Sequence, residues 1–173
     1  MSVEYFDNII PFKTRDNIFQ LCSKSTFRLG WPDSEMEVEK ATPCLHSCWS
    51  EERLNKSGIF PYIDQCIQKV PWFTHRNLHL IVLNLTQNAD VHYIHVHPDQ
   101  SAVLYYVNLE WRDGWHGETI FYNPSNLDEV LFTSVYKPGR IILFDGNTPH
   151  AIRPQSIKGP RYRMTLTLFF NHQ

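Results

Sequence analysis

The second half of this sequence is a succession of short strand-like runs with no helical segment between them. Eight runs rich in β-branched and aromatic residues follow one another from Asn77, separated by Asn, Asp, Gly or Pro. In order they are LHLIVLNL, VHYIHV, AVLYYVNL, ETIFY, EVLFTSVY, RIILF, HAIRP and RYRMTLTLFF. So many short strands within about ninety residues predict an antiparallel double sheet, a jelly roll or barrel.

The first 75 residues have a different character. Apolar residues at mixed spacings of 3 and 4 predict helices in Asp16–Cys22 and in PYIDQCIQKV, which Pro71 ends. Between them, residues 29–52 are rich in proline, acids and tryptophan, and we expect a loop that wraps the core. With no internal repeat or linker, we expect a single domain over 1–173. It is mainly β, a double-stranded β-helix (jelly roll) over 76–171 with flanking N-terminal helices in 1–75.

Charge and hydropathy give no reason to expect a nucleic-acid or membrane partner. The formal net charge is -2 and the sequence pI is about 6.5. No apolar run reaches the ~18 to 20 residues of a membrane span, and MSVEYFDNII lacks the basic start and long apolar core of a secretory signal. We expect a cytoplasmic protein.

The four cysteines are Cys22, Cys44, Cys48 and Cys66. The cluster Cys44-Leu-His46-Ser-Cys48 suggests zinc, but its spacing is not that of paired CxxC knuckles and no second Cys/His pair lies nearby. Ordinary reduced thiols are the preferred interpretation.

A histidine-rich segment, VHYIHVHPDQ, carries the candidate chemistry. In an extended strand His95 and His97 project to the same side, and Asp99 follows if the strand continues. His150, in FDGNTPHAIRP, is the best candidate for a third ligand from a distant strand. Three protein ligands on one face leave the other positions of an iron-type site open for substrate or cofactor. The alternative is that these histidines are polar residues on a solvated strand face.

Two partners for His95 stay open at this point. Ligand type favours Asp99, because His97 and Asp99 would form a His-x-acid pair and a carboxylate is the usual third member of a two-histidine iron site. Strand register favours His95 with His97, because only Gln100 and Ser101 separate Asp99 from the next run. We therefore expect His95 to be a ligand, with either His97 or Asp99 beside it.

The last run contains two candidate anion-binding residues. Arg161 and Arg163 alternate along a strand that ends in LTLFF, and a cation turned into an apolar barrel needs an anion. A guanidinium can hold a carboxylate with two hydrogen bonds, and Thr165 and Thr167 share the face of Arg163. The alternative places both arginines at the solvent side.

These segments together resemble the iron(II)- and 2-oxoglutarate-dependent dioxygenases, specifically the prolyl-4-hydroxylase-like branch with its short bacterial and phage forms. The resemblance runs roughly from Leu78 to Phe170. It rests on the order of the His95-x-His97/Asp99 segment, LYYVNLEW with WHGETIFY, YKPGRIILFDGNTPHAIRP and RYRMTLTLFF.

The resemblance implies a role for several positions. His95 and His150 match the first and the distal iron histidine, Arg163 matches the arginine that binds the far carboxylate of 2-oxoglutarate, and Arg161 is the fallback. Tyr106 and Thr167 match residues near the same cosubstrate. Two positions depart from the family pattern: His97 stands where an acid is expected, and His116-Gly117 replaces Gly-Gly before Glu-Thr.

The implied reaction is the hydroxylation of an unidentified substrate, a small molecule or a peptide such as one with a prolyl residue. Iron(II), 2-oxoglutarate and O2 are the implied cofactors, with ascorbate as a candidate stimulant. Trp111, Trp115 and His116 either shape a substrate rim or pack within their turn. Two other functions remain: a metal-binding cupin that does not use 2-oxoglutarate, and a non-enzymatic jelly-roll binding module.

Overall fold

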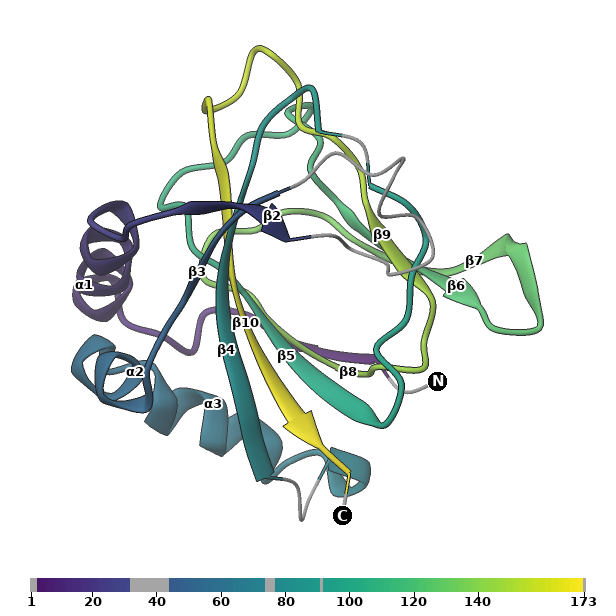
Figure 1. Cartoon of the computed structure of the whole chain (residues 1–173), viewed down its shortest axis with the longest axis horizontal. Coiled ribbons are helices and arrows are strands. Elements are labelled where there is room, and N and C mark those ends of the chain that lie inside the picture. The colour runs from purple at the N-terminus through teal and green to yellow at the C-terminus, as the bar shows by residue number, and fades with distance from the viewer. Residues whose placement is uncertain (1–2, 32–43, 74–76, 91, 173) are drawn as a thin grey trace.

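Two antiparallel sheets face each other and enclose the inner part of the core (Figure 1). This computed structural model describes residues 3–31, 44–73, 77–90 and 92–172. The larger sheet has seven strands in the order β1-β8-β5-β10-β4-β3-β2, and the smaller has three in the order β7-β6-β9. The arrangement confirms the predicted jelly roll with flanking N-terminal helices.

The bounds of the strands follow the predicted runs closely. Seven of the eight runs contain a strand. The strands are β1 Val3–Phe6, β2 Arg28–Trp31, β3 Cys44–Cys48, β4 Asn77–Thr86, β5 Gln100–Tyr106, β6 Thr119–Asn123, β7 Asn126–Ser134, β8 Ile141–Asp145, β9 His150–Ile152 and β10 Arg163–Asn171.

The strand β10 divides the core because its side chains alternate between two environments. Met164, Leu166, Leu168 and Phe170 pack in the larger apolar cluster, against the helices. The intervening residues, which begin with Arg163, turn to the other face, between the two sheets. That strand is almost entirely buried, so both of its faces are interior.

The helices cover the outer face of the larger sheet (Figure 1). Local sequence explains α2 best: the Ser50 hydroxyl accepts a hydrogen bond from the backbone N–H of Arg53, and Gly58 ends the helix with a positive φ of 74°. The helices are α1 Phe12–Ser23, α2 Glu51–Ser57 and α3 Phe60–Ile67, followed by the 3₁₀ turn η2 Pro71–Phe73. Among the described residues, no helix has the length and apolar character needed to cross a membrane.

The prediction of a strand over VHYIHV was wrong. Within residues 92–97, the only strand-type pairing is an isolated antiparallel bridge between His95 and His150. The neighbouring strand β9 has three residues, and Pro149 before it has no amide hydrogen with which to extend the ladder. The backbone N–H of His97 instead donates to the carbonyl of Gly146, at an N···O distance of 2.7 Å.

The N-terminal region contributes three strands that the sequence analysis did not predict. β1 pairs with β8 at one edge of the larger sheet, whereas β3 pairs with β4 and carries β2 at the other edge. Residues 29–52, expected to be a loop, therefore hold β2 and β3 in their described parts. These strands were missed because they are short and CLHSC alternates polar with apolar residues only weakly.

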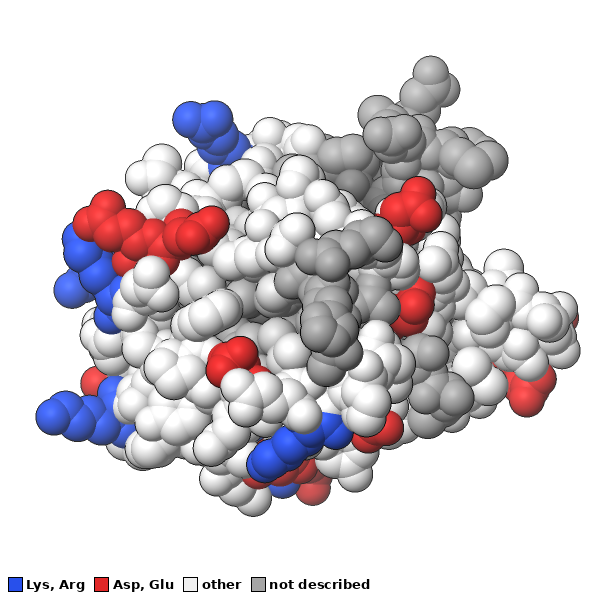
Figure 2. All heavy atoms as spheres, turned by 90° about the horizontal axis from the view of Figure 1, so that it is seen from below, with Lys and Arg blue, Asp and Glu red and all other residues white. Residues whose placement is uncertain are grey.

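Charged side chains are scattered over the face of the molecule shown in Figure 2, where neither sign gathers into one continuous patch. Cys22, Cys48 and Cys66 are free thiols. The side chain of Cys44 lies outside the described part, so the suggested Cys44–His46–Cys48 cluster is not tested.

Candidate metal centre

Three histidines from two distant parts of the chain meet between the sheets. One nitrogen from each of His95, His97 and His150 lies within 4.8 Å of the other two, and this histidine cluster is the only group of potential metal ligands found in the described residues. The His95–His150 bridge brings the two backbones together, and His97 follows two residues later on the same side. Three converging imidazoles form a ligand set suited to iron, zinc, copper or nickel.

Backbone carbonyls orient two of the three rings. The Nδ1 of His150 lies 2.8 Å from the carbonyl oxygen of Thr148, and the Nδ1 of His95 lies 3.0 Å from that of Tyr93. An imidazole that donates its Nδ1–H to a carbonyl presents a lone pair on Nε2, which is the common arrangement for metal-ligating histidines. Burial and the two neighbouring imidazoles lower the pKa of His150 well below its ordinary value, so the ring stays neutral and able to bind a cation.

The alternative ligand Asp99 lies outside this cluster. It is exposed, and its positive φ of 60° belongs to the turn that follows His97. The reason is local: Pro98 and Asp99 turn the chain into β5 before the alternation that would bring Asp99 back to the same side continues. Of the two partners left open for His95, the structure brings His97 to it.

A cavity of about 50 Å³ opens beside the histidine cluster. Its polar lining comes from Asn84 on β4, Thr119 on β6, and Thr165 and Thr167 on β10. This volume is on the order of one or two water molecules, which suits a metal ion with exchangeable ligands. Thr167, which the resemblance associates with the cosubstrate, is therefore next to the histidines.

Arg163 is fully buried at the start of β10. Its Nε donates to the carbonyl of Gly117 at 2.8 Å, and its Nη2 donates to the Oγ1 of Thr119 at 3.2 Å. The guanidinium carbon lies 5.4 Å from the ring centroid of Tyr106 and 5.1 Å from that of Tyr136. These contacts hold the guanidinium plane in a fixed orientation.

One nitrogen of this guanidinium has no partner. Nη1 is buried without a hydrogen bond, and no carboxylate of the described residues lies within 4.0 Å of Arg163. Leaving a buried cation unpaired is costly, so a fixed, unpaired guanidinium fits an anionic ligand such as the carboxylate of a dicarboxylic acid. Arg161, the fallback, is exposed and lies over the ring of Tyr162.

Thr119 links the two halves of the site, and the sequence analysis did not single it out. Its hydroxyl accepts from both Arg163 and the Tyr106 hydroxyl, which lies 2.8 Å away, while the residue also lines the cavity beside the histidines. Its position in the WHGETIFY segment was the available signal. Tyr106 is thus connected to the Arg163 guanidinium through Thr119, and its ring is stacked on that of Tyr136.

Gly117 and Trp111 form the wall behind Arg163. A Cβ on Gly117 would lie 3.0 Å from the Trp111 ring and 3.2 Å from Cδ of Arg163, and its φ is 82°, so only glycine fits without strain. The indole of Trp111 donates to the carbonyl of His116 and packs on Tyr136. Of the two roles considered for Trp111, these contacts fit turn packing.

The chain is similar in structure to several solved oxygenases. A Trichoplax adhaerens prolyl hydroxylase in complex with a hypoxia inducible factor peptide fragment superposes with a TM-score of 0.71 at 17% identity, covering 98% of this chain and 83% of that one. A Pseudomonas putida prolyl-4-hydroxylase gives a TM-score of 0.69 at 14% identity, with coverages of 99% and 93%. The chain has the fold of the 2-oxoglutarate–iron(II) oxygenases.

A third oxygenase structure holds the cosubstrate. The viral collagen prolyl hydroxylase from Paramecium Bursaria Chlorella virus-1, in its 2-oxoglutarate complex, gives a TM-score of 0.67 at 13% identity, with coverages of 99% and 97%. No protein-family model and no curated protein sequence matches the chain. At these identities the likeness establishes the oxygenase fold, and the activity has to be argued from the residues of this chain.

Proposed function

We propose that this protein is an iron(II)- and 2-oxoglutarate-dependent oxygenase that hydroxylates a small molecule or a peptide, with a prolyl residue as the first candidate. One relationship supports this most strongly: the histidine cluster and the unpaired Nη1 of Arg163 are joined through the single side chain of Thr119. 2-Oxoglutarate requires such a pair, because one of its ends binds the metal and its distal carboxylate binds a cation. In such a protein, iron with 2-oxoglutarate and O2 supplies the oxidising chemistry.

The residues of the chain would then bind, orient and exclude water. His95, His97 and His150 would hold the metal on one face, while Arg163 fixes the distal carboxylate through its free Nη1. The Thr119 hydroxyl holds both Arg163 and Tyr106 in place, so the guanidinium is already oriented before a ligand binds. Thr165 and Thr167 offer hydroxyls at the cavity wall, and the apolar residues Leu104, Phe144 and Phe169 limit the access of water.

A second candidate function is favoured by His97. An all-imidazole ligand set is also what a metal-dependent enzyme of the cupin type would use without 2-oxoglutarate. In that case Arg163 would have no anion to bind.

We also propose a cytoplasmic location, for which the sequence gives the support.

The two candidates separate on cosubstrate binding and turnover. Purified protein with iron(II) and ascorbate should release succinate from 2-oxoglutarate, and the rate should rise when the correct substrate is added from a panel that includes prolyl peptides. His150→Ala should abolish metal retention and succinate release while circular dichroism stays unchanged. Metal binding without any 2-oxoglutarate binding would reject the oxygenase in favour of the second candidate, and succinate release by His150→Ala would remove that residue from the metal site.

A further inference from the structure

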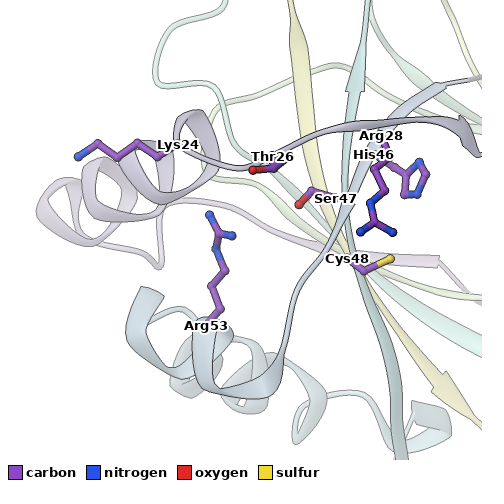
Figure 3. A pocket seen from close by; sticks show the side chains of 7 residues that line it. All are labelled: Lys24, Thr26, Arg28, His46, Ser47, Cys48 and Arg53. Atoms are coloured by element: carbon purple, nitrogen blue, oxygen red, sulfur yellow. The ribbon is translucent and has the colours of Figure 1, made fainter.

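A second pocket lies at the edge of the larger sheet, where β2 separates from β3. The two strands pair from Trp31 only as far as Arg28, opposite His46, so beyond His46 this edge of β3 has no neighbouring strand among the described residues. A notch of about 370 Å³ results, and we call it the β3 notch (Figure 3). It is lined by Lys24, Thr26, Arg28, His46, Ser47, Cys48 and Arg53.

The lining of the β3 notch is basic, although the chain as a whole is slightly acidic. It contains three cationic residues and no Asp or Glu, against 18 acidic and 16 basic residues in the sequence. Arg53 is held in place by Nη2 hydrogen bonds of 2.8 Å to the Leu21 carbonyl and to the Ser25 hydroxyl. Arg28 is exposed and makes no ion pair within the described residues. Among the described residues that line it, the notch therefore carries positive charge and no acidic counter-ion.

The strand register shows that one row of side chains runs from this notch to the cavity beside the histidine cluster. Arg28 lies opposite His46, His46 opposite Asn84, and Asn84 opposite Thr165, so all four side chains lie on one face of the sheet. Asn84 and Thr165 line the cavity beside the histidine cluster. Arg28 is thus two strand spacings, about 10 Å, from the wall of that cavity.

The two sides of β3 contribute differently to the notch. Figure 3 shows Arg28, His46 and Cys48 on one side of the strand, with Ser47 and Arg53 on the other and the Lys24 side chain turned away. The first three are on the face that leads to Asn84. An anion beside Arg28 would therefore lie on the same face of the sheet as Asn84 and Thr165, which line the cavity beside the histidine cluster.

The geometry points to the β3 notch as a subsite for an oxyanion, a carboxylate or a phosphate, carried by the molecule that this protein oxidises, with Arg28 as its anchor. A guanidinium suits both groups because its N–H donors match a pair of oxygens. The assignment of the anion to the oxidised molecule rests on the proposed oxygenase function. It restricts the substrate class to molecules whose acidic group is separated from the reacting carbon by at least the roughly 10 Å between Arg28 and the cavity wall, or to peptides with an acidic residue at such a separation.

Anion titrations followed by NMR test this subsite. Protein loaded with Zn(II) and saturating 2-oxoglutarate, so that Arg163 is occupied, is titrated with inorganic phosphate and separately with acetate at constant ionic strength. Shifts of the backbone amide signals of Thr26, His46, Ser47 and Cys48 are expected. The anion that binds more tightly, phosphate or carboxylate, identifies the acidic group of the substrate.

Matched variants decide whether Arg28 is the anchor. Arg28→Gln should weaken binding about tenfold or more, because it removes a charge-assisted hydrogen bond. Lys13→Gln, an exposed cation outside the notch, should leave binding within twofold. Absence of shifts in the notch, or equal affinity in Arg28→Gln, overturns the proposal. The titration is repeated without Zn(II) and 2-oxoglutarate, and 2-oxoglutarate binding is measured separately. A failure of cosubstrate binding alone rejects the oxygenase function, and with it the assignment of the anion to an oxidised molecule, but leaves the anion subsite standing.

Discussion

The main chains of His95 and His150 exchange two hydrogen bonds, each with an N···O distance of 3.0 Å, and their rings lie 4.4 Å apart between centroids. The pair is a single antiparallel bridge, isolated from any longer ladder. It fixes the separation of two candidate metal-ligating side chains through the backbone, which varies less than side-chain rotamers do. The relative position of these two histidines is therefore set by two backbone hydrogen bonds that join the first residue of β9 to a segment outside any regular strand.

The first prediction concerns the unusual third histidine. His97→Asp should change the metal preference of the site, raising the ratio of Mn(II) to Zn(II) affinity about tenfold or more, because carboxylates suit manganese whereas imidazoles favour zinc. Isothermal titration calorimetry with each metal measures the ratio. His79→Asp places the same substitution at an exposed position outside the cluster and should leave it unchanged. An unaltered ratio in His97→Asp would show that His97 does not bind the metal.

The second prediction concerns the two arginines. Arg163→Ala should lower 2-oxoglutarate affinity by about 100-fold, because the cosubstrate carboxylate loses a buried charged partner. The exposed Arg161 provides the matched control, and Arg161→Ala should bind 2-oxoglutarate normally. Cosubstrate binding is measured by calorimetry with Zn(II) present.

Because Arg163 is fully buried, its loss also affects folding, and a milder variant keeps the prediction testable. Thr119→Val removes the hydroxyl that accepts from both the Arg163 Nη2 and the Tyr106 hydroxyl, while nearly preserving volume. It should reduce 2-oxoglutarate affinity about tenfold. A folded Thr119→Val protein with unaltered affinity would show that Thr119 does not help Arg163 to bind 2-oxoglutarate.

The third prediction concerns the ion pair that ties the N-terminus to the larger sheet. Asp7 accepts hydrogen bonds from Arg140 at 2.8 and 2.9 Å and from Lys137 at 2.9 Å. The Arg140 hydrogen bond, helped by Lys137, holds the pKa of Asp7 below its ordinary value of 3.8 despite partial burial. Asp7→Asn should therefore lower the free energy of unfolding by about 2 kcal/mol at pH 7, where the carboxylate is charged.

The sign of the pH dependence follows from the depressed pKa. Below the unfolded-state pKa the unfolded chain binds a proton that the folded protein does not, so the wild type loses this contribution as the pH falls below about 4. Urea unfolding should show the difference between wild type and Asp7→Asn shrinking from pH 5 towards pH 3. A difference that stays constant over this range would show that the charge of Asp7 does not stabilise the fold.

The local sequence pattern was sufficient to predict most of the strands, because alternating polar and apolar residues and β-branched residues favour an extended backbone within a few residues. It failed for VHYIHV, where the strand-like composition has no partner strand long enough to pair with. It also failed to predict β3, which has a weak strand pattern but is stabilised by pairing with β4. Strand formation in both cases depended on a neighbour that lies far away in the sequence.

The sequence by itself determined the types of side chain available: closely spaced histidines, a later histidine after a proline, and an arginine at the head of an apolar strand. Only the tertiary structure decided which of them meet. His97 rather than Asp99 joins His95 because a turn at Pro98 and Asp99 interrupts the alternation, and Arg163 rather than Arg161 is buried because β10 begins between them. These choices depend on turns and on pairing between distant strands, whose energies are absent from any short stretch of sequence.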